Sequence, residues 1–365
     1  MTIGFDARFM SVPGGIPRYC RELLCALTAQ SPLTRFVVLV KKIPRDFPAP
    51  ANIRWVETDI RWYGWREQIL LGRLMNSIHD VDVWHIPHWN VPLTLRRPFV
   101  MTVHDFIFEE YPTHDSTVIA RITFAVRLAA WRLIISSAIS RARAVITVSS
   151  YVRERLIERF PAAALKSSVI HLGLSRLPKA QSPDTVIAQP FFLVVGNSYP
   201  HKNHELVFKM VHEHPELNAH WYIVTHRDRF SEAHELAVKK QHLDDRIHFL
   251  FDASDAELSW LYQNARALVH PSRAEGFGIP PLEALSFGKP IIVAKTTSLP
   301  EILGTEAVWI SPDDSDELYF ALSNVLKNTT TDADGEHAKS RQRHARQFSW
   351  QAAALSTQNI YKSVL

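Results

Sequence analysis

Short apolar runs alternate with longer amphipathic segments along most of the chain. The runs Thr2–Asp6, Arg35–Val40 and Phe99–Val103 are largely apolar, which is typical of strands buried on both faces of a parallel sheet. Between such runs, segments such as 16–29 repeat apolar residues at three- and four-residue spacing, which is typical of helices with one buried face. The alternation predicts an α/β fold in which helices cover parallel sheets.

The same patterns predict a set of elements along the chain. Strands are expected at 2–6, 35–40, 81–84, 99–103, 144–148, 168–171, 191–195, 220–225, 247–251, 267–270 and 290–294. Helices are expected at 16–29, 119–143, 151–160, 202–212, 231–240, 255–264, 281–287 and 350–364. Residues 329–336 are polar and are expected to form a loop.

The alternation is interrupted once, at residues 173–190. This segment, GLSRLPKAQSPDTVIAQP, contains three prolines, one glycine and no periodic apolar pattern, which is typical of a linker. A chain of 365 residues is also long enough for two domains. We therefore expect two doubly wound, Rossmann-like domains with a cleft between them, the first at 1–172 and the second from residue 191.

Charge is divided unequally between the two halves. The net charge of the chain is +4, yet residues 1–180 carry 24 basic and 14 acidic side chains, whereas residues 181–365 carry 17 and 23. Nucleic acid is not favoured as the partner of the basic half, because its arginines are spread over many elements without a recognised binding module. The asymmetry indicates that the two domains meet different ligands.

Composition excludes several classes of protein. The chain has 46% hydrophobic and 21% charged residues, which is ordinary for a globular protein. Cys20 and Cys25 share one predicted helix and cannot form a disulfide framework, which indicates a reducing compartment. The first residues do not resemble a signal peptide, and no uncharged run reaches the roughly 18 residues that span a bilayer. We expect a cytoplasmic protein, at most attached to the cytoplasmic face of the inner membrane.

The most informative segment is 270–290, HPSRAEGFGIPPLEALSFGKP. A strand ends at His270, a glycine-rich loop containing Glu275 follows, and a proline pair opens a helix that carries Glu283 in its first turn. Glycines near a helix N-terminus let an anionic or hydroxyl-bearing ligand approach backbone N–H groups closely. The two carboxylates can face the same opening and accept hydrogen bonds from sugar hydroxyls. The alternative is that Glu283 only complements the helix dipole and the glycines only turn the chain.

Further motifs occur in order along the chain. They are PGGIPRY at 13–19, TVHDF at 102–106, ITVSSYVRERL at 146–156, FLVVGNSYPHKNHELV at 192–207, SDAELSWLYQNARALVHPS at 254–272 and FSWQAAALSTQNIY at 348–361. With SRAEGFGIPPLEALSFGKPIIV, this set resembles the retaining, GT-B-fold glycosyltransferases of family 4, also called group 1, which transfer a sugar from a nucleotide diphosphate. The resemblance spans nearly the whole chain. It implies a donor domain at 191–346 and a last segment, 347–365, whose helix crosses back to the N-terminal domain.

The resemblance implies a role for each matching residue. Glu275 would hydrogen-bond the donor sugar, Glu283 would accept from the ribose hydroxyls, and His104 would contact the sugar near the reacting carbon. Lys202 would neutralise the diphosphate, since lysine is a usual phosphate partner. Backbone amides of the glycine-rich loops would contact the sugar or the phosphate; these residues are Gly14, Gly15, Gly276, Phe277 and Gly278.

One position departs from the family pattern. Many members have an arginine directly after the glycine, where this chain has Asn197, so a positive charge at the leaving group is missing. His201, or Arg273 beside Glu275, is a candidate to replace that charge. The departure resembles a GNxxxxKN subgroup that often transfers mannose and related sugars.

The resemblance therefore implies a hexosyltransferase without a cofactor. It would move mannose or a related 6-deoxyhexose from a GDP-sugar to a lipid-linked glycan of bacterial surface polysaccharide, such as the O-antigen of lipopolysaccharide. The basic N-terminal half would face that acceptor. A UDP- or ADP-sugar donor is the alternative, and a non-catalytic, nucleotide-sugar-binding partner of an active transferase is the alternative from another class.

Two other features suggest weaker hypotheses. Asp80 and Asp82 have the D-x-D spacing of a metal site, but they lie where a buried strand begins, and three-residue patterns of this kind arise by chance, so we expect no metal. The segment 119–143 is an apolar helix with five arginines. It either lies on an anionic membrane or packs in the core with its arginines reaching solvent.

Overall fold

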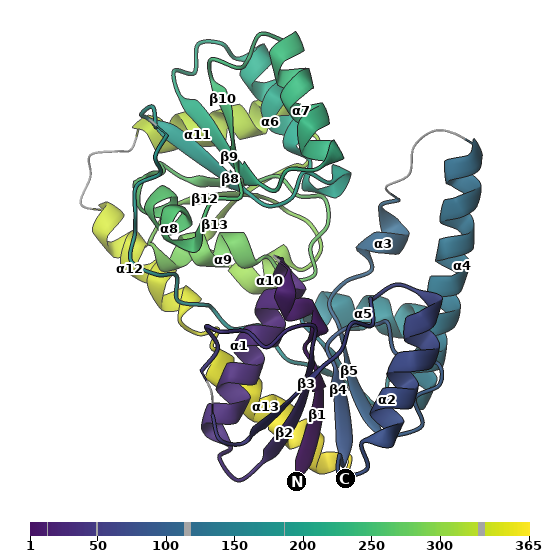
Figure 1. Ribbon diagram of the computed structural model, residues 1–365. Helices are drawn as coiled ribbons and strands as arrows, with labels where there is room; N and C mark the ends of the chain where they lie inside the picture. The colour runs from purple at the N-terminus through teal and green to yellow at the C-terminus, as the bar shows by residue number, and fades with distance from the viewer. Residues whose placement is uncertain (13, 49, 113–117, 186, 328–332) are drawn as a thin grey trace. The chain divides into compact units, whose positions relative to one another are not determined.

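The computed structural model describes residues 1–12, 14–48, 50–112, 118–185, 187–327 and 333–365, which form two compact units. Unit 1 consists of Met1–Gly173 and Phe348–Leu365, and unit 2 consists of Leu174–Gln347. Each unit is a parallel sheet flanked by helices (Figure 1). Pro13 of the PGGIPRY motif and residues 329–332 of the expected polar loop lie outside the described residues.

Unit 1 is built on a seven-stranded sheet in the order β3-β2-β1-β4-β5-β6-β7, with every pair parallel. The strands are β1 (Thr2–Asp6), β2 (Arg35–Val40), β3 (Ile53–Glu57), β4 (Val83–Ile86), β5 (Phe99–Val103), β6 (Ala144–Thr147) and β7 (Ser167–Val169). Glycine is required at Gly4 in β1, because a Cβ there would lie 2.2 Å from the ring of Trp84 in β4. The strand order reverses between β1 and β4, and α/β folds bind ligands outside the carboxyl ends of the strands at such a switch point.

The helices of unit 1 include one from the far end of the chain. They are η1 (Arg8–Ser11), α1 (Gly15–Gln30), the π-helix η2 (Glu67–Leu71), α2 (Gly72–Ser77), α3 (Ile107–Glu110), α4 (Val118–Arg141), α5 (Ser150–Arg159), η3 (Pro161–Ala163) and α13 (Trp350–Ser363). Tyr361 in α13 is fully buried, and its hydroxyl lies 2.6 Å from Nδ1 of His85 in β4. This contact ties the C-terminal helix to the sheet of unit 1.

Unit 2 repeats the strand order with six parallel strands, β10-β9-β8-β11-β12-β13. The strands are β8 (Phe191–Val195), β9 (His220–Thr225), β10 (Ile247–Phe251), β11 (Leu268–His270), β12 (Ile291–Ala294) and β13 (Ala307–Ile310). The helices are η4 (Pro200–Lys202), α6 (His204–Glu213), α7 (Arg229–Lys240), α8 (Asp255–Asn264), α9 (Ile279–Ser286), α10 (Leu299–Leu303), α11 (Ser315–Lys327) and α12 (Ala333–Ala345). Its switch point lies between β8 and β11.

Some predicted elements differ from the structure. The expected loop at 329–336 is wrong at its end, because α12 begins at Ala333. The sequence of α12 is polar, so it shows no apolar periodicity. The helix is stabilised by packing, with Ala338 against Gly288. The helix predicted from residue 202 begins at His204, and α9 begins at Ile279, so Glu283 lies in its second turn instead of its first. Among the elements that were not predicted are the strands β3 and β13 and the helices α2, α3, α10 and α11.

Part of the expected linker is held against unit 2. The backbone N–H of Gln181 donates to the carbonyl of Ala256 (3.0 Å), and the Ser259 hydroxyl donates to the carbonyl of Pro178 (2.8 Å). Both partners lie at or in α8. The segment is therefore attached to unit 2 through hydrogen bonds to this helix.

Candidate functional site

The loops that follow β8 and β11 bring Lys202 and Glu275 together. Lys202 Nζ donates a hydrogen bond to Glu275 Oε1 over 2.6 Å, and Nε2 of His270, the last residue of β11, lies 2.8 Å from the same oxygen. The side chains of Lys202 and Glu275 are 13% and 10% exposed, so the pair is largely desolvated but still reached by solvent. Because β8 and β11 are neighbours in the sheet, the switch point of unit 2 itself sets this distance.

Glu275 is an ionised carboxylate at neutral pH. Burial alone would raise its pKa, but the charge of Lys202 and the hydrogen bond from His270 outweigh burial and hold the pKa well below its usual range. Glu275 is therefore a hydrogen-bond acceptor and not an acid. The sequence did not single out His270 as a partner, although it sits five residues before Glu275 at the end of a predicted strand.

A second loop fixes the backbone around Glu275. Its N–H donates to Oγ1 of Thr297 (2.9 Å), and the Ser298 hydroxyl donates to its carbonyl (2.9 Å). Both partners come from the loop between β12 and α10. No motif signalled them, because hydroxyl residues in loops are common and only the strand order brings this loop to β11.

The rest of the EGFG loop leads into α9. Gly278, the N-cap of α9, has φ of +103°, and a Cβ there would lie 2.6 Å from Leu299. Both the backbone conformation and the lack of space therefore require glycine. The two preceding residues, Gly276 and Phe277, are buried. Glu283 is 2% exposed on α9 and accepts a hydrogen bond from the Tyr262 hydroxyl (3.0 Å).

The position that departs from the family pattern has its own geometry. Gly196 has φ of +145° and lies against the Lys202 side chain, whose Cε would be 3.7 Å from an added Cβ. Asn197 Oδ1 is buried and, within the described ranges, has no hydrogen-bond partner. An acceptor left in this state beside Lys202 is suited to a ligand donor.

The two candidates for the missing charge behave differently. Burial and the nearby charge of Lys202 lower the pKa of His201 to about 4, so without a ligand its imidazole is neutral at physiological pH. A bound diphosphate would raise this pKa, so the role of His201 stays a prediction. Arg273 forms an ion pair with Asp313 (2.6 Å).

In unit 1, His104 follows β5. Its Nε2 lies 3.0 Å from the carbonyl oxygen of Pro87, which can only accept, so Nε2 carries the proton. The ring also meets Tyr19 edge to face, with 4.8 Å between centroids. Burial lowers the pKa of His104 to about 4, and the imidazole is neutral with Nδ1 as its acceptor atom.

Gly14 and Gly15 begin α1. Gly14 is the N-cap and has φ of +136°, a backbone conformation that other residues rarely adopt. The nearest atom to an added Cβ is 3.7 Å away, on Pro17, so conformation and not crowding requires the glycine. Gly15 is the first helical residue.

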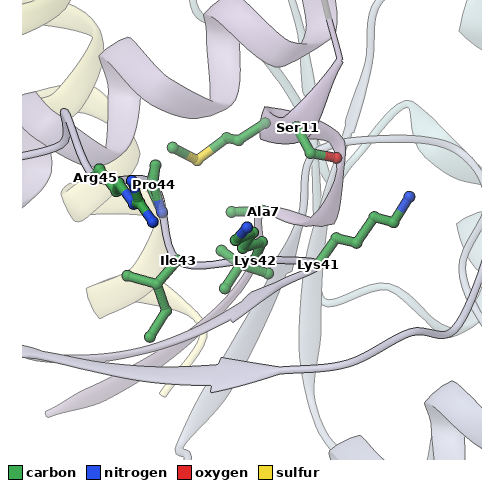
Figure 2. Close-up of a pocket in the computed structure, with 9 residues that line it drawn as sticks. Ala7, Ser11, Lys41, Lys42, Ile43, Pro44 and Arg45 are labelled. Carbon is green, nitrogen blue, oxygen red and sulfur yellow. The ribbon is translucent and has the colours of Figure 1, made fainter.

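A basic pocket of about 440 Å³ lies beside the carboxyl end of β2 (Figure 2). Its lining is Ala7, Met10, Ser11, Val40, Lys41, Lys42, Ile43, Pro44 and Arg45. Lys41, Lys42 and Arg45 are exposed, and no ion pair joins any of them to another of the described residues. The sequence analysis did not single out this pocket, although two lysines directly after a buried strand are a visible signal.

Both aspartates of the D-x-D pair have partners in unit 1. Asp82 accepts a hydrogen bond from the backbone N–H of Thr2 (2.8 Å), and Asp80 forms an ion pair with Arg54 (2.8 Å) on the surface. Among the residues that the structure describes, no group of three or more histidines, cysteines and carboxylates is placed to hold a metal.

Matches to known proteins identify the family. Residues 13–175 match Glycosyltransferase Family 4, and residues 179–348 match Glycosyl transferases group 1. The O-antigen chain mannosyltransferase RfbU of Salmonella typhimurium is 30% identical over 270 residues, which cover 72% of this chain and 70% of RfbU. The chain belongs to the group 1, family 4 glycosyltransferases.

Other relatives of this glycosyltransferase agree. The O-antigen chain mannosyltransferase B of Escherichia coli is 27% identical over 296 residues, 77% of this chain and 74% of that one. Among solved structures, Anabaena HepE in complex with UDP and glucose superimposes with a TM-score of 0.76 at 18% identity, over 99% of both chains. The likeness extends over both units and confirms the expected GT-B fold of two Rossmann-like domains.

Proposed function

We propose that this glycosyltransferase moves mannose, or a related 6-deoxyhexose, from a GDP-sugar to a lipid-linked glycan of bacterial surface polysaccharide, with retention at the anomeric carbon. The cluster of Lys202, Glu275 and His270 carries the proposal, since it joins a phosphate-binding cation to an ionised hydroxyl acceptor at a switch point. The two O-antigen mannosyltransferase relatives favour mannose. HepE, described with UDP and glucose, supports a UDP-sugar as the alternative donor.

The cluster suggests how the donor is held. Lys202 and Glu275 neutralise each other over 2.6 Å before a ligand binds. A donor can replace this pair, with Lys202 turning to the diphosphate and Glu275 accepting from sugar hydroxyls. After the exchange Lys202 is paired with the phosphate, and Glu275 accepts hydrogen bonds from the sugar hydroxyls and from His270.

The chemistry we propose is front-side displacement. Glu275 already accepts from Lys202 and His270 and serves as a hydroxyl acceptor, so we assign it no nucleophilic role. The departing phosphate takes the proton of the acceptor hydroxyl while the new glycosidic bond forms on the same face. The protein contributes positioning, and stabilises charge through Lys202, the amides of Gly276 to Gly278 and the neutral His104.

Ligand-induced stabilisation tests the donor. GDP, UDP, ADP and their sugar conjugates are compared by thermal unfolding; a ligand at 100 times its Kd adds about 2.7 kcal/mol of stability. GDP-mannose should raise Tm most, and the Lys202→Ala variant should lose that rise. A larger rise with UDP-glucose would select the alternative donor. Slow hydrolysis of GDP-mannose without acceptor separates an enzyme from a non-catalytic sugar-binding partner.

We also propose that unit 1 contacts an anionic membrane through α4. The N-terminal half of this helix stands away from the sheet (Figure 1), with Ile119 78% and Val126 65% exposed, whereas Trp131 and Ile135 are buried. Helix Ile119–Arg141 is long and apolar enough to cross a membrane by length and composition, which the residue count from sequence had excluded. Its arginines are spread along the helix, and together with the exposed apolar side chains they suit a surface position.

Vesicle sedimentation tests the membrane contact. The protein should sediment with phosphatidylglycerol vesicles and less with phosphatidylcholine vesicles, and Val126→Asp should release it. Leu33→Asp, at a 95% exposed leucine of the same unit outside α4, is the matched control and should sediment normally. Equal sedimentation of both variants with the unmodified protein would remove α4 from the contact. Reversing Lys41, Lys42 and Arg45 to glutamate tests whether the basic pocket contributes.

A further inference from the structure

Four aromatic side chains at one edge of unit 1 have no part in the donor proposal. We define them as the aromatic shelf: Trp62, Tyr63, Trp89 and Phe108. Trp62 and Tyr63 follow β3, Trp89 follows β4, and Phe108 lies in α3 after β5. The loops after parallel strands meet at the carboxyl edge of the sheet, where α/β folds bind their ligands.

Three of the shelf rings lie in a row, and the fourth is joined to them through the buried ring of Phe9. Tyr63 and Trp89 have centroids 5.5 Å apart with 32° between ring planes, and Trp89 and Phe108 are stacked at 6.5 Å and 27°. Trp62 continues the row through a stacked contact with Phe9 at 5.0 Å. Tyr63 is 55% exposed, and the other three shelf rings are half-buried. Flat, partly exposed rings of this kind present apolar faces to a ligand.

Tyr63 is held in an unfavourable backbone conformation. Its φ is +61°, which is uncommon for a bulky residue and costs free energy unless surrounding contacts enforce it. Its backbone N–H donates to Glu67 Oε2 (2.7 Å), and its hydroxyl lies 2.9 Å from His88 Nε2. Contacts at both ends of the residue therefore aim an exposed ring in one direction.

A buried ion network holds Glu67 in turn. Arg8 pairs with Asp6 (2.8 Å) and with Glu67 (2.6 Å), and Asn90 donates its side-chain amide to Glu67; the side chains of the three charged residues are at most 2% exposed. Glu67 also opens the π-helix η2, a rare element found most often at functional sites. Buried ion pairs seldom stabilise a fold more than apolar packing does. A network that fixes an exposed, strained tyrosine is therefore better explained by binding than by stability.

The shelf also adjoins the proposed reacting residue of unit 1. Nε2 of His104 donates to the carbonyl of Pro87, and the next residue, His88, contacts both Tyr63 and Trp89 with its ring. A ligand on the shelf would thus lie beside His104. In an enzyme that joins a sugar to a glycan, the group expected there is the acceptor.

We propose that the aromatic shelf binds a pyranose ring of the acceptor glycan by stacking the ring's C–H face on Tyr63 and Trp89. A pyranose has an apolar C–H face and hydroxyls at its rim, which matches rigid aromatic faces set among polar side chains. The inference rests on the proposed function for the acceptor side of the reaction, but it requires neither GDP nor mannose on the donor side.

Simple glycosides test the shelf without the natural acceptor. The full chain is titrated with methyl α-mannopyranoside and methyl N-acetyl-β-glucosaminide, with acyclic mannitol as the probe that lacks a ring, and followed by saturation-transfer NMR. Tyr63→Gly removes the ring while permitting the positive φ, and Tyr63→Phe keeps the ring without its hydroxyl. Phe320→Ala, at a 62% exposed phenylalanine of unit 2, is the matched control.

We expect at least one glycoside to bind and mannitol to give no signal. Tyr63→Gly should weaken glycoside binding by about three- to tenfold, the range of one aromatic stacking contact, while Tyr63→Phe and Phe320→Ala stay within about twofold. The proposal is overturned if neither glycoside binds, if Tyr63→Gly binds as the unmodified chain does, or if Tyr63→Phe loses as much as Tyr63→Gly. Hydrolysis of GDP-mannose is measured separately. Glycoside binding to the aromatic shelf can therefore be interpreted even if the donor proposal fails.

Discussion

The two units have the same strand order around their switch points, yet they use charge differently there. In unit 2, Lys202 and Glu275 pair near the surface, with side chains 13% and 10% exposed. In unit 1, the charges of Arg8, Asp6 and Glu67 are at most 2% exposed, and aromatic rings occupy the edge of the sheet beside them. Charge is available to a ligand in unit 2 and serves as a scaffold in unit 1.

This difference shows how one topology serves two kinds of ligand. The switch point fixes where a site lies, and the loops decide its chemistry. A diphosphate requires accessible cations, whereas a neutral sugar ring suits an apolar face. Removing one charge from each unit in turn tests this difference.

The largest effect is expected for Arg8→Met. It leaves Asp6 and Glu67 as uncompensated buried carboxylates, so the free energy of unfolding should fall by about 3–5 kcal/mol. Arg8→Lys should recover only part of this loss, because an ammonium cannot reproduce the two-pronged contact with Asp6. Urea unfolding measures both variants. A loss below about 1 kcal/mol would mean that the network is not a scaffold.

In unit 2, the corresponding change should act on activity. Glu275→Gln keeps the size of the side chain but removes the charge that accepts from Lys202 and His270. Transfer should fall by at least about a hundredfold, or 2.7 kcal/mol, and Lys202→Ala should lose most activity as well, without unfolding in either case. Glu232→Gln, at an exposed glutamate in the first turn of α7, is the matched control and should transfer normally. Full activity in Glu275→Gln would remove the site assignment.

How far the sequence predicts these two sites differs for a physical reason. The EGFG loop, Lys202 and the strands on either side follow a motif with fixed spacing, so local pattern is enough to predict them. The partners of Glu275 depend on strand order, which brings Thr297 from another loop and cannot be read from local spacing.

The aromatic shelf was not predicted because its signal is spread over the chain. Tyr63 and Trp89 lie in the loops after β3 and β4, and Phe108 lies in α3 after β5, so the shelf residues are far apart in the sequence. Neither the +61° φ of Tyr63 nor the π-helix that follows has a sequence signature. Helix α12 was missed for a related reason, since its polar sequence gives no apolar periodicity and its packing against Gly288 supplies the stability.

A smaller effect is expected at His270, which we propose as a positioning residue for Glu275. His270→Leu removes the hydrogen bond to Glu275 Oε1 and should lower kcat about tenfold, or 1.4 kcal/mol, with little change in the donor KM. His270→Gln retains a donor and should restore most of kcat. Equal kcat values for the two variants would show that the hydrogen bond does not position Glu275.

A pH-dependent effect compares one buried histidine in each unit. The pKa of His104 in unit 1 and of His201 in unit 2 is lowered by burial to about 4 from the usual 6.5. Below pH 6.5 the two histidines therefore become protonated in the unfolded chain, whereas in the folded chain they stay neutral until the pH approaches 4. Stability is fully present above pH 6.5 and is lost as pH falls toward 4, by at most about 1.4 kcal/mol per pH unit for each histidine.

Urea unfolding between pH 4.5 and 6.5 measures that slope. His104→Asn and His201→Asn should each flatten it by the contribution of one histidine, and the double variant by the sum, because the sites lie in different units. The lowered pKa of Glu275 does not interfere, since a carboxylate of that kind loses stability only as pH falls below its ordinary value of 4.5. If only one variant flattens the slope, the two histidines are not equally buried in solution, and the likeness between the two switch points does not extend to their histidines.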